Sequence, residues 1–166
     1  MSKANLLVTF DPTHVESAKK EIEEKLSEVK EKGKLLKAED GLAQISVKDA
    51  KKAVKALSKL KKFAITNRWI PVDKWTNAKI PDMQKCIKTL SKEISAKDKW
   101  KLDLGKHQGA VDIPQRDLIV KLTEVIENPN VDLEKPTKIV RVDIIGKTAA
   151  ISILNKDEIF NAADKR

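Results

Sequence analysis

The order of elements in the amino-terminal half is the feature that most restricts how this chain can fold. Residues 5–10 (NLLVTF) predict a strand, and apolar residues at helical spacing predict a helix over residues 13–30. Two short apolar runs joined by Asp40-Gly41 predict a hairpin, because Asp-Gly is a favoured two-residue turn. A lysine-rich helix over residues 49–62 and a strand over residues 63–72 follow.

The resulting order is strand, helix, strand, strand, helix, strand, which is the split βαβ arrangement. We therefore expect a ferredoxin-like domain over residues 1–76, with two helices on one face of an antiparallel sheet. Residues 72–81 (VDKWTNAKIP) are polar and end in a proline, and we interpret them as a linker.

The second half follows a different pattern. A helix is predicted after Pro81, and the alternation in residues 99–104 (KWKLDL) predicts a strand. A loop over residues 105–114 leads to a helix that Pro114 opens, and two strands flank the turn at Gly146-Lys147. The whole chain is thus predicted to be α+β, with a small α/β domain over residues 77–166.

Charge favours a polyanionic partner. Lys and Arg number 34 against 25 Asp and Glu, which leaves a formal net charge of +9. Nucleic acid is the commonest polyanion that such a surface meets. The same surface would equally serve solubility or tolerance of heat, so both interpretations remain open.

Motifs for chemistry are missing from the sequence. No glycine-rich phosphate loop is present, His14 and His107 are far apart, and a single cysteine cannot build a multi-cysteine metal site. No signal peptide or membrane span is visible, and we expect a cytoplasmic protein. The sequence therefore predicts no cofactor, no metal and no enzymatic activity.

Three carboxylates, Asp132, Glu134 and Asp143, are candidates for acid–base chemistry or for structure. Asp132 precedes a turn, where aspartate usually accepts backbone N–H groups. Asp143 shares a strand face with Arg141, which favours a solvated or ion-paired role. We interpret these residues as structural. A catalytic cleft would have to be built from Asp103, Asp112 or Asp132.

Residues 131–154 (VDLEKPTKIVRVDIIGKTAAISIL) resemble the closing portion of a THUMP domain, and residues 100–126 fit the strand, basic loop and helix that precede it. The resemblance implies a ferredoxin-like domain followed by a THUMP domain. It is nearest to the stand-alone, Tan1-like THUMP adaptors, which assist the acetyltransferase that makes N4-acetylcytidine in tRNA. It thus implies a non-catalytic tRNA-binding adaptor with that acetyltransferase as a partner.

The resemblance also implies where RNA would bind. Lys106 and His107 match the basic loop of the family and Arg116 matches its helix arginine, whereas Gly105 replaces a residue that is usually basic. Predicted geometry adds Lys99, Lys101 and Lys121. We expect these six residues to contact a tRNA acceptor stem and its 3′ end, mainly through phosphates.

Two alternatives accompany this hypothesis. The lysines of the helix over residues 49–62 either extend the RNA surface or form a solvated helix face. The alternative to an RNA-binding adaptor is a protein-interaction or assembly module, whose positive charge would be incidental.

Overall fold

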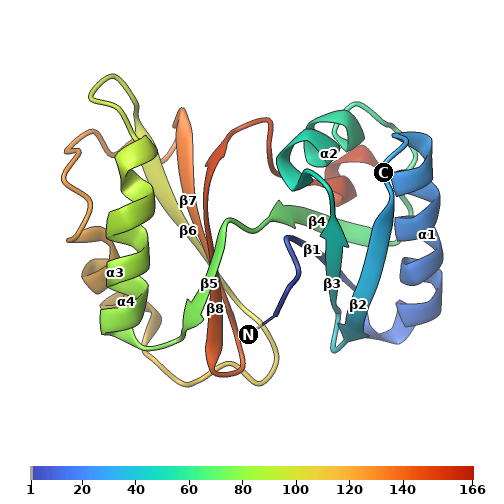
Figure 1. The fold of residues 1–166 in the computed structure, drawn as a ribbon, viewed down its shortest axis with the longest axis horizontal. Coiled ribbons are helices and arrows are strands. Elements are labelled where there is room, and N and C mark those ends of the chain that lie inside the picture. Colours follow the sequence, from blue (N-terminus) through green and yellow to red (C-terminus); the bar gives the residue numbers. More distant parts are fainter. Residues whose placement is uncertain (1) are drawn as a thin grey trace. The chain divides into compact units, whose positions relative to one another are not determined.

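The computed structural model describes residues 2–166, which divide into two compact units (Figure 1). Residues 2–72 and 157–166 form the amino-terminal unit, and residues 73–156 form the central unit. The predicted boundary lies between residues 76 and 77 and assigns the last ten residues to the second domain. Together the described residues form two sheets and four α-helices, so the fold is α+β as predicted.

The amino-terminal unit contains one five-stranded sheet in the order β2-β3-β1-β4-β9, in which all neighbouring strands are antiparallel. Along the chain its strands and helices are β1 (Leu6–Phe10), α1 (Val15–Glu28), β2 (Gly33–Glu39), β3 (Leu42–Val47), α2 (Ala50–Leu57), β4 (Thr66–Pro71) and β9 (Phe160–Asn161). Short 3-10 helices cover Pro12–His14 and Ala162–Lys165.

Local sequence explains the boundaries of these elements. Asp40 and Gly41 both have positive φ, 54° and 80°, as the predicted tight hairpin turn requires. Asp49 caps α2 by accepting the Lys52 N–H at 3.1 Å. The predicted helix over residues 49–62 is too long, because α2 ends at Leu57 and its lysine pattern continues into a non-helical segment.

The central unit contains a four-stranded sheet in the order β5-β8-β7-β6. Its elements are β5 (Lys74–Asn77), α3 (Ile80–Leu90), the 3-10 helix Ser91–Glu93, β6 (Trp100–Lys106), α4 (Gln115–Thr123), β7 (Lys138–Ile145) and β8 (Thr148–Asn155). Strands β6 and β7 are parallel, and the other pairs are antiparallel. A parallel pair needs a crossover connection, which the segment containing α4 supplies.

The interpretation of residues 72–81 as a linker is wrong, because Lys74–Asn77 form the edge strand β5. These four residues are too few, and alternate too little between apolar and polar side chains, to predict a strand from sequence. Their partner, β8, lies about 70 residues later along the chain, so its pairing could not be read locally.

The central sheet has one apolar and one mixed face. On β7, Val140, Val142 and Ile144 belong to the core that also contains Met83 and Ile87 of α3 and Leu118 and Leu122 of α4. The alternate side chains of Arg141 and Asp143 therefore lie on the other face, because strand side chains alternate. No helix among residues 2–166 has the length and apolar composition of a membrane span.

In the amino-terminal unit, α1 is tied to the start of β4 by a buried glutamate. The carboxylate of Glu21 accepts the backbone N–H groups of Ala64 at 2.6 Å and of Thr66 at 2.6 Å, and it also accepts that of Ile65. Burial raises the pKa of Glu21, but these hydrogen bonds outweigh it and hold the pKa below its ordinary value of 4.5.

We expect Glu21→Gln to lower the free energy of unfolding by about 2 kcal/mol at pH 7, because the amide replaces a charged acceptor. Since the pKa of Glu21 is depressed in the folded state, its contribution is complete above pH 4.5 and is lost as the pH falls further. Urea unfolding at pH 7 and at lower pH measures both effects. Glu23→Gln, on the exposed side of the same helix, is the control and should change little.

Candidate nucleic-acid interface

The structure brings three of the six predicted site residues together at one end of β6. Lys106 is the last residue of this strand, and its Nζ donates a hydrogen bond to the carbonyl of Ile113, just before α4 begins. Arg116 is the second residue of α4 and is exposed. His107 follows Lys106 directly. Lys106, His107 and Arg116 therefore lie at the same end of the central sheet.

The loop after β6 is held against the turn between β7 and β8. The His107 N–H donates to the carbonyl of Ile144 at 3.0 Å, and the Val111 N–H donates to that of Gly146 at 3.0 Å. The Ala78 N–H donates to the carbonyl of Lys147 at 2.9 Å. This places exposed Lys147, and exposed Lys79 next to Ala78, at the same end of the sheet.

We call the set Lys79, Lys106, His107, Arg116 and Lys147 the basic edge. Its charge is not uniform, because three carboxylates lie in the loop and in the first turns of α3 and α4. Asp112 and Asp117 are exposed, and Asp82 is half-buried. These three carboxylates offset three of the four permanent cations. Recognition of an anion here would therefore depend on individually placed contacts more than on net charge.

The other predicted residues lie elsewhere. Lys99 precedes β6 at its opposite end, with its Nζ 3.9 Å from Asp132, and Lys101 is 3.6 Å from Asp103. Lys121 is in the last turn of α4. Since a strand rises about 3.3 Å per residue, Lys99 and Lys106 are separated by roughly 20 Å. The structure thus separates Lys106, His107 and Arg116, at one end of the sheet, from Lys99, Lys101 and Lys121.

A buried charge cluster lies behind the basic edge. Arg141 donates to both carboxylate oxygens of Asp143, from Nε at 3.0 Å and from Nη2 at 2.7 Å. His107 Nε2 lies 2.8 Å from Asp143 Oδ1. Arg141 is 5% exposed and Asp143 is 1% exposed, so the predicted ion pair exists but is not solvated.

The electrostatics of the cluster keep both partners charged. Burial raises the pKa of Asp143, but the hydrogen bonds from His107 and Arg141 and the positive charge of Arg141 outweigh it and bring the pKa below its ordinary value. Burial lowers the pKa of Arg141, and the hydrogen bonds and charge of Asp143 more than compensate. Asp143 is therefore an ionised acceptor at neutral pH.

Gly105 is required by this cluster. It is paired with Asp143 across β6 and β7, and a Cβ atom at Gly105 would lie 2.5 Å from Arg141 Nη2 and 2.5 Å from Asp143 Oδ1. A basic side chain, which the family resemblance would place here, would therefore displace the Arg141–Asp143 pair. Sequence reasoning missed this role, although a glycine within a strand often marks a close approach of other atoms.

The remaining carboxylates have structural roles. Asp132 accepts the backbone N–H groups of Glu134 and Lys135, each at 3.0 Å, as its turn position predicts. Within residues 2–166 no three His, Cys, Asp or Glu side chains cluster in a way that could hold a metal ion.

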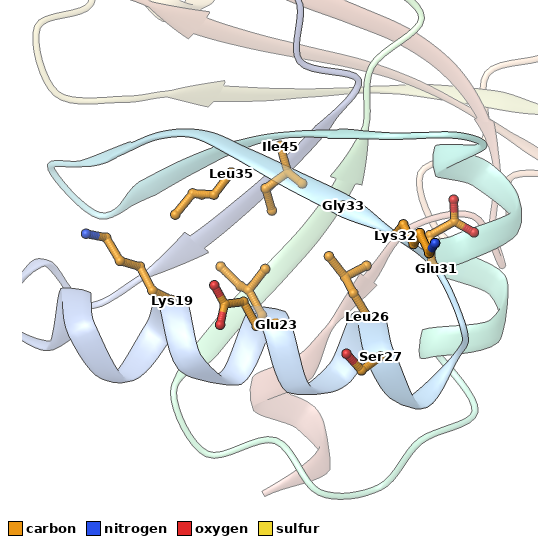
Figure 2. Close-up of a pocket in the computed structure, with 10 residues that line it drawn as sticks. Lys19, Glu23, Leu26, Ser27, Glu31, Lys32, Gly33, Leu35 and Ile45 are labelled. Carbon is orange, nitrogen blue, oxygen red and sulfur yellow. The ribbon is translucent and has the colours of Figure 1, made fainter.

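The amino-terminal unit carries two other surface features. Exposed lysines accompany α2 and the segment after it: Lys48, Lys52, Lys55, Lys59, Lys61 and Lys62. A pocket of about 350 Å³ lies between α1 and β2, and its apolar lining includes Leu26, Leu35 and Ile45 (Figure 2). None of the predicted site residues lines this pocket, so it is separate from the basic edge.

The sequence matches no protein-family model and no curated protein. Solved structures, however, share the fold. PH1313 from Pyrococcus horikoshii Ot3 matches with a TM-score of 0.63 and 14% identity, over 92% of this chain and 55% of that one. TrmN from Thermus thermophilus matches with a TM-score of 0.60 and 15% identity, over 95% and 46%. A 4-thiouridine synthetase solved as an RNA complex with bound ATP matches with a TM-score of 0.57 and 14% identity, over 96% and 42%.

These matches agree with the THUMP resemblance, because PH1313 is a THUMP-domain protein and the synthetase contains a THUMP domain. The chain spans about half the length of the structures it matches.

The prediction of a non-catalytic adaptor, and with it the prediction that the chain is not an enzyme, is wrong. The structures that share the fold include methyltransferases, TrmN among them, rather than non-catalytic adaptors. They give no support to a Tan1-like adaptor or to an acetyltransferase partner. The absence of familiar motifs misled the prediction, because identities of 14–15% leave few motifs to compare.

Replacing one partner of the buried Arg141–Asp143 pair should lower the free energy of unfolding more, per substitution, than replacing both together. We expect Arg141→Met and Asp143→Asn each to lower the free energy of unfolding by about 3–5 kcal/mol, because each leaves a buried charge without its partner. The free energy of unfolding lost in the double variant should be clearly smaller than the sum of the losses in the two single variants. Urea unfolding of all four proteins measures this coupling.

Glu39→Gln is the control, because the Lys37–Glu39 ion pair is solvent-exposed and lies in the other unit, and it should change the free energy of unfolding little. Strict additivity of the two single losses would show that Arg141 and Asp143 do not stabilise each other.

Proposed function

We propose that this chain is the RNA-binding part of an RNA-modifying enzyme that acts on tRNA, and that the RNA lies on the basic edge. The observation that carries the proposal is the convergence of Lys106, His107 and Arg116 at one end of a fold shared with RNA-modifying enzymes. The 4-thiouridine synthetase that shares the fold was solved with RNA, which supports RNA as the ligand class.

We further propose that the central unit is the THUMP domain and that the amino-terminal unit is a ferredoxin-like domain. The central unit contains all the residues that carry the THUMP resemblance. Strands β2-β3-β1-β4 are antiparallel and occur in the chain order strand, helix, strand, strand, helix, strand, which supports the ferredoxin-like assignment.

In this proposal the basic edge holds the phosphate backbone. Arg116 is exposed and makes no ion pair with any residue of 2–166, so its guanidinium is available for bidentate contact with a phosphate. The Lys106 ammonium uses one of its three donors on the Ile113 carbonyl and keeps two for the ligand. Base modification by the enzyme then acts on an RNA that these contacts orient.

A second RNA contact on α2 is a further candidate. The exposed lysines on α2 and just after it include Lys52, Lys55 and Lys59. Within residues 2–166, Lys55 alone of these three makes an ion pair, with its Nζ 4.0 Å from Asp157 Oδ2. Such a surface would add affinity without sequence preference.

We expect Arg116→Ala to weaken tRNA binding by roughly fivefold and to reduce the slope of log affinity against log salt by about 1, because one phosphate contact is lost. Fluorescence anisotropy with a labelled tRNA transcript over a salt series measures both values. Lys121→Ala removes a charge from the other end of the same helix and should have the smaller effect.

Equal losses in Arg116→Ala and Lys121→Ala would contradict a site at the basic edge. A larger loss in Lys52→Ala would place the main contact on α2. Absence of saturable binding would refute the RNA-binding function and favour a protein-interaction module.

A further inference from the structure

His107 is held in one orientation by a group that cannot donate a hydrogen. Asp143 is ionised and already accepts from both Nε and Nη2 of Arg141. A carboxylate in this state is only an acceptor, so the 2.8 Å contact requires His107 Nε2 to carry the hydrogen and donate it. In the neutral imidazole the other ring nitrogen, Nδ1, is then an acceptor.

That second nitrogen is open to solvent. His107 Nδ1 makes no hydrogen bond with any described residue, whereas no buried side-chain nitrogen or oxygen in residues 2–166 lacks a partner. The unpartnered atom is therefore not buried, although only 14% of the side chain is exposed. The ring thus presents one fixed acceptor at the basic edge, next to Lys106.

A phosphate group cannot satisfy this atom, because ionised phosphate oxygens only accept hydrogen bonds. The group that fits must donate. Along a nucleic-acid backbone, the ribose 2′-hydroxyl is a donor that is present at every position of RNA and absent from DNA. Arginine and lysine at the same edge would hold the neighbouring phosphates of that backbone.

We infer that His107 Nδ1 accepts a hydrogen bond from a ribose 2′-hydroxyl and is a specificity-determining residue that selects RNA over other backbones. Asp143 is its positioning residue, because it fixes the tautomer, and Arg141 holds Asp143. This inference rests on the proposed RNA-binding function, and it adds the chemical group that is recognised.

The test compares two fluorescent hairpins of one sequence with a single-stranded 3′ end, one of RNA and one with 2′-fluoro in place of every 2′-hydroxyl. Fluorine cannot donate a hydrogen bond. Anisotropy with the full chain is measured at pH 8. We expect the wild-type protein to bind the RNA roughly three- to tenfold more tightly, which is the effect of one hydrogen bond.

His107→Gln separates positioning from recognition. The glutamine amide can still donate to Asp143, but it has no acceptor at the position of Nδ1. Affinity for RNA should fall to the value for the 2′-fluoro hairpin, and affinity for the latter should stay unchanged. Gln108→Ala, at the exposed neighbouring residue, is the control and should preserve the preference.

Saturable but equal wild-type binding of both hairpins would overturn the inference and leave the proposed RNA-binding function intact. The same conclusion would follow if His107→Gln weakened both hairpins alike. Binding of neither hairpin would refute the proposed function itself. The wild-type comparison involves no substitution, so it decides the matter even if the variant fails to fold.

Discussion

The buried pair of Arg141 and Asp143 is the interaction on which the central unit's surface depends. It lies on β7, opposite the face that packs against α3 and α4, and its two hydrogen bonds keep both groups charged away from water. Removing a charge from water is costly unless its partner is well placed, so the pair fixes the residues around it. Gly105 leaves room for the pair, and His107 is tied to it.

The basic edge follows from this arrangement. The His107 ring and its backbone N–H both bind β7, which holds the loop after β6 near the β7–β8 turn. Lys106 joins the same loop to the start of α4, so Arg116 comes close to residues that lie ten positions earlier in the chain. Side chains from β6, the loop after it, α4, the β7–β8 turn and the residue before α3 thus lie at one end of a sheet, where a rigid scaffold can position them for a ligand.

Local patterns predicted most of the elements. The Asp40-Gly41 hairpin, the Asp49 cap and the alternation around Trp100 depend only on neighbouring residues, and all three are present. Strand β5 was missed because its pairing with β8 is distant in sequence. The grouping of Lys106 with Arg116, and the distance of Lys99 from both, depend on the crossover between β6 and β7, which spacing along the chain does not reveal. The non-catalytic adaptor was predicted from the absence of familiar motifs and from a family resemblance, whereas the structures that share the fold include methyltransferases.

We propose that RNA lies on the basic edge of the central unit. Backbone amide shifts of the ¹⁵N-labelled chain, followed by NMR during titration with a tRNA acceptor-stem hairpin, test it most directly. We expect the largest changes in residues 105–116 and 145–148, two segments joined by backbone hydrogen bonds. Changes confined to α2 or to residues 128–137 would contradict it.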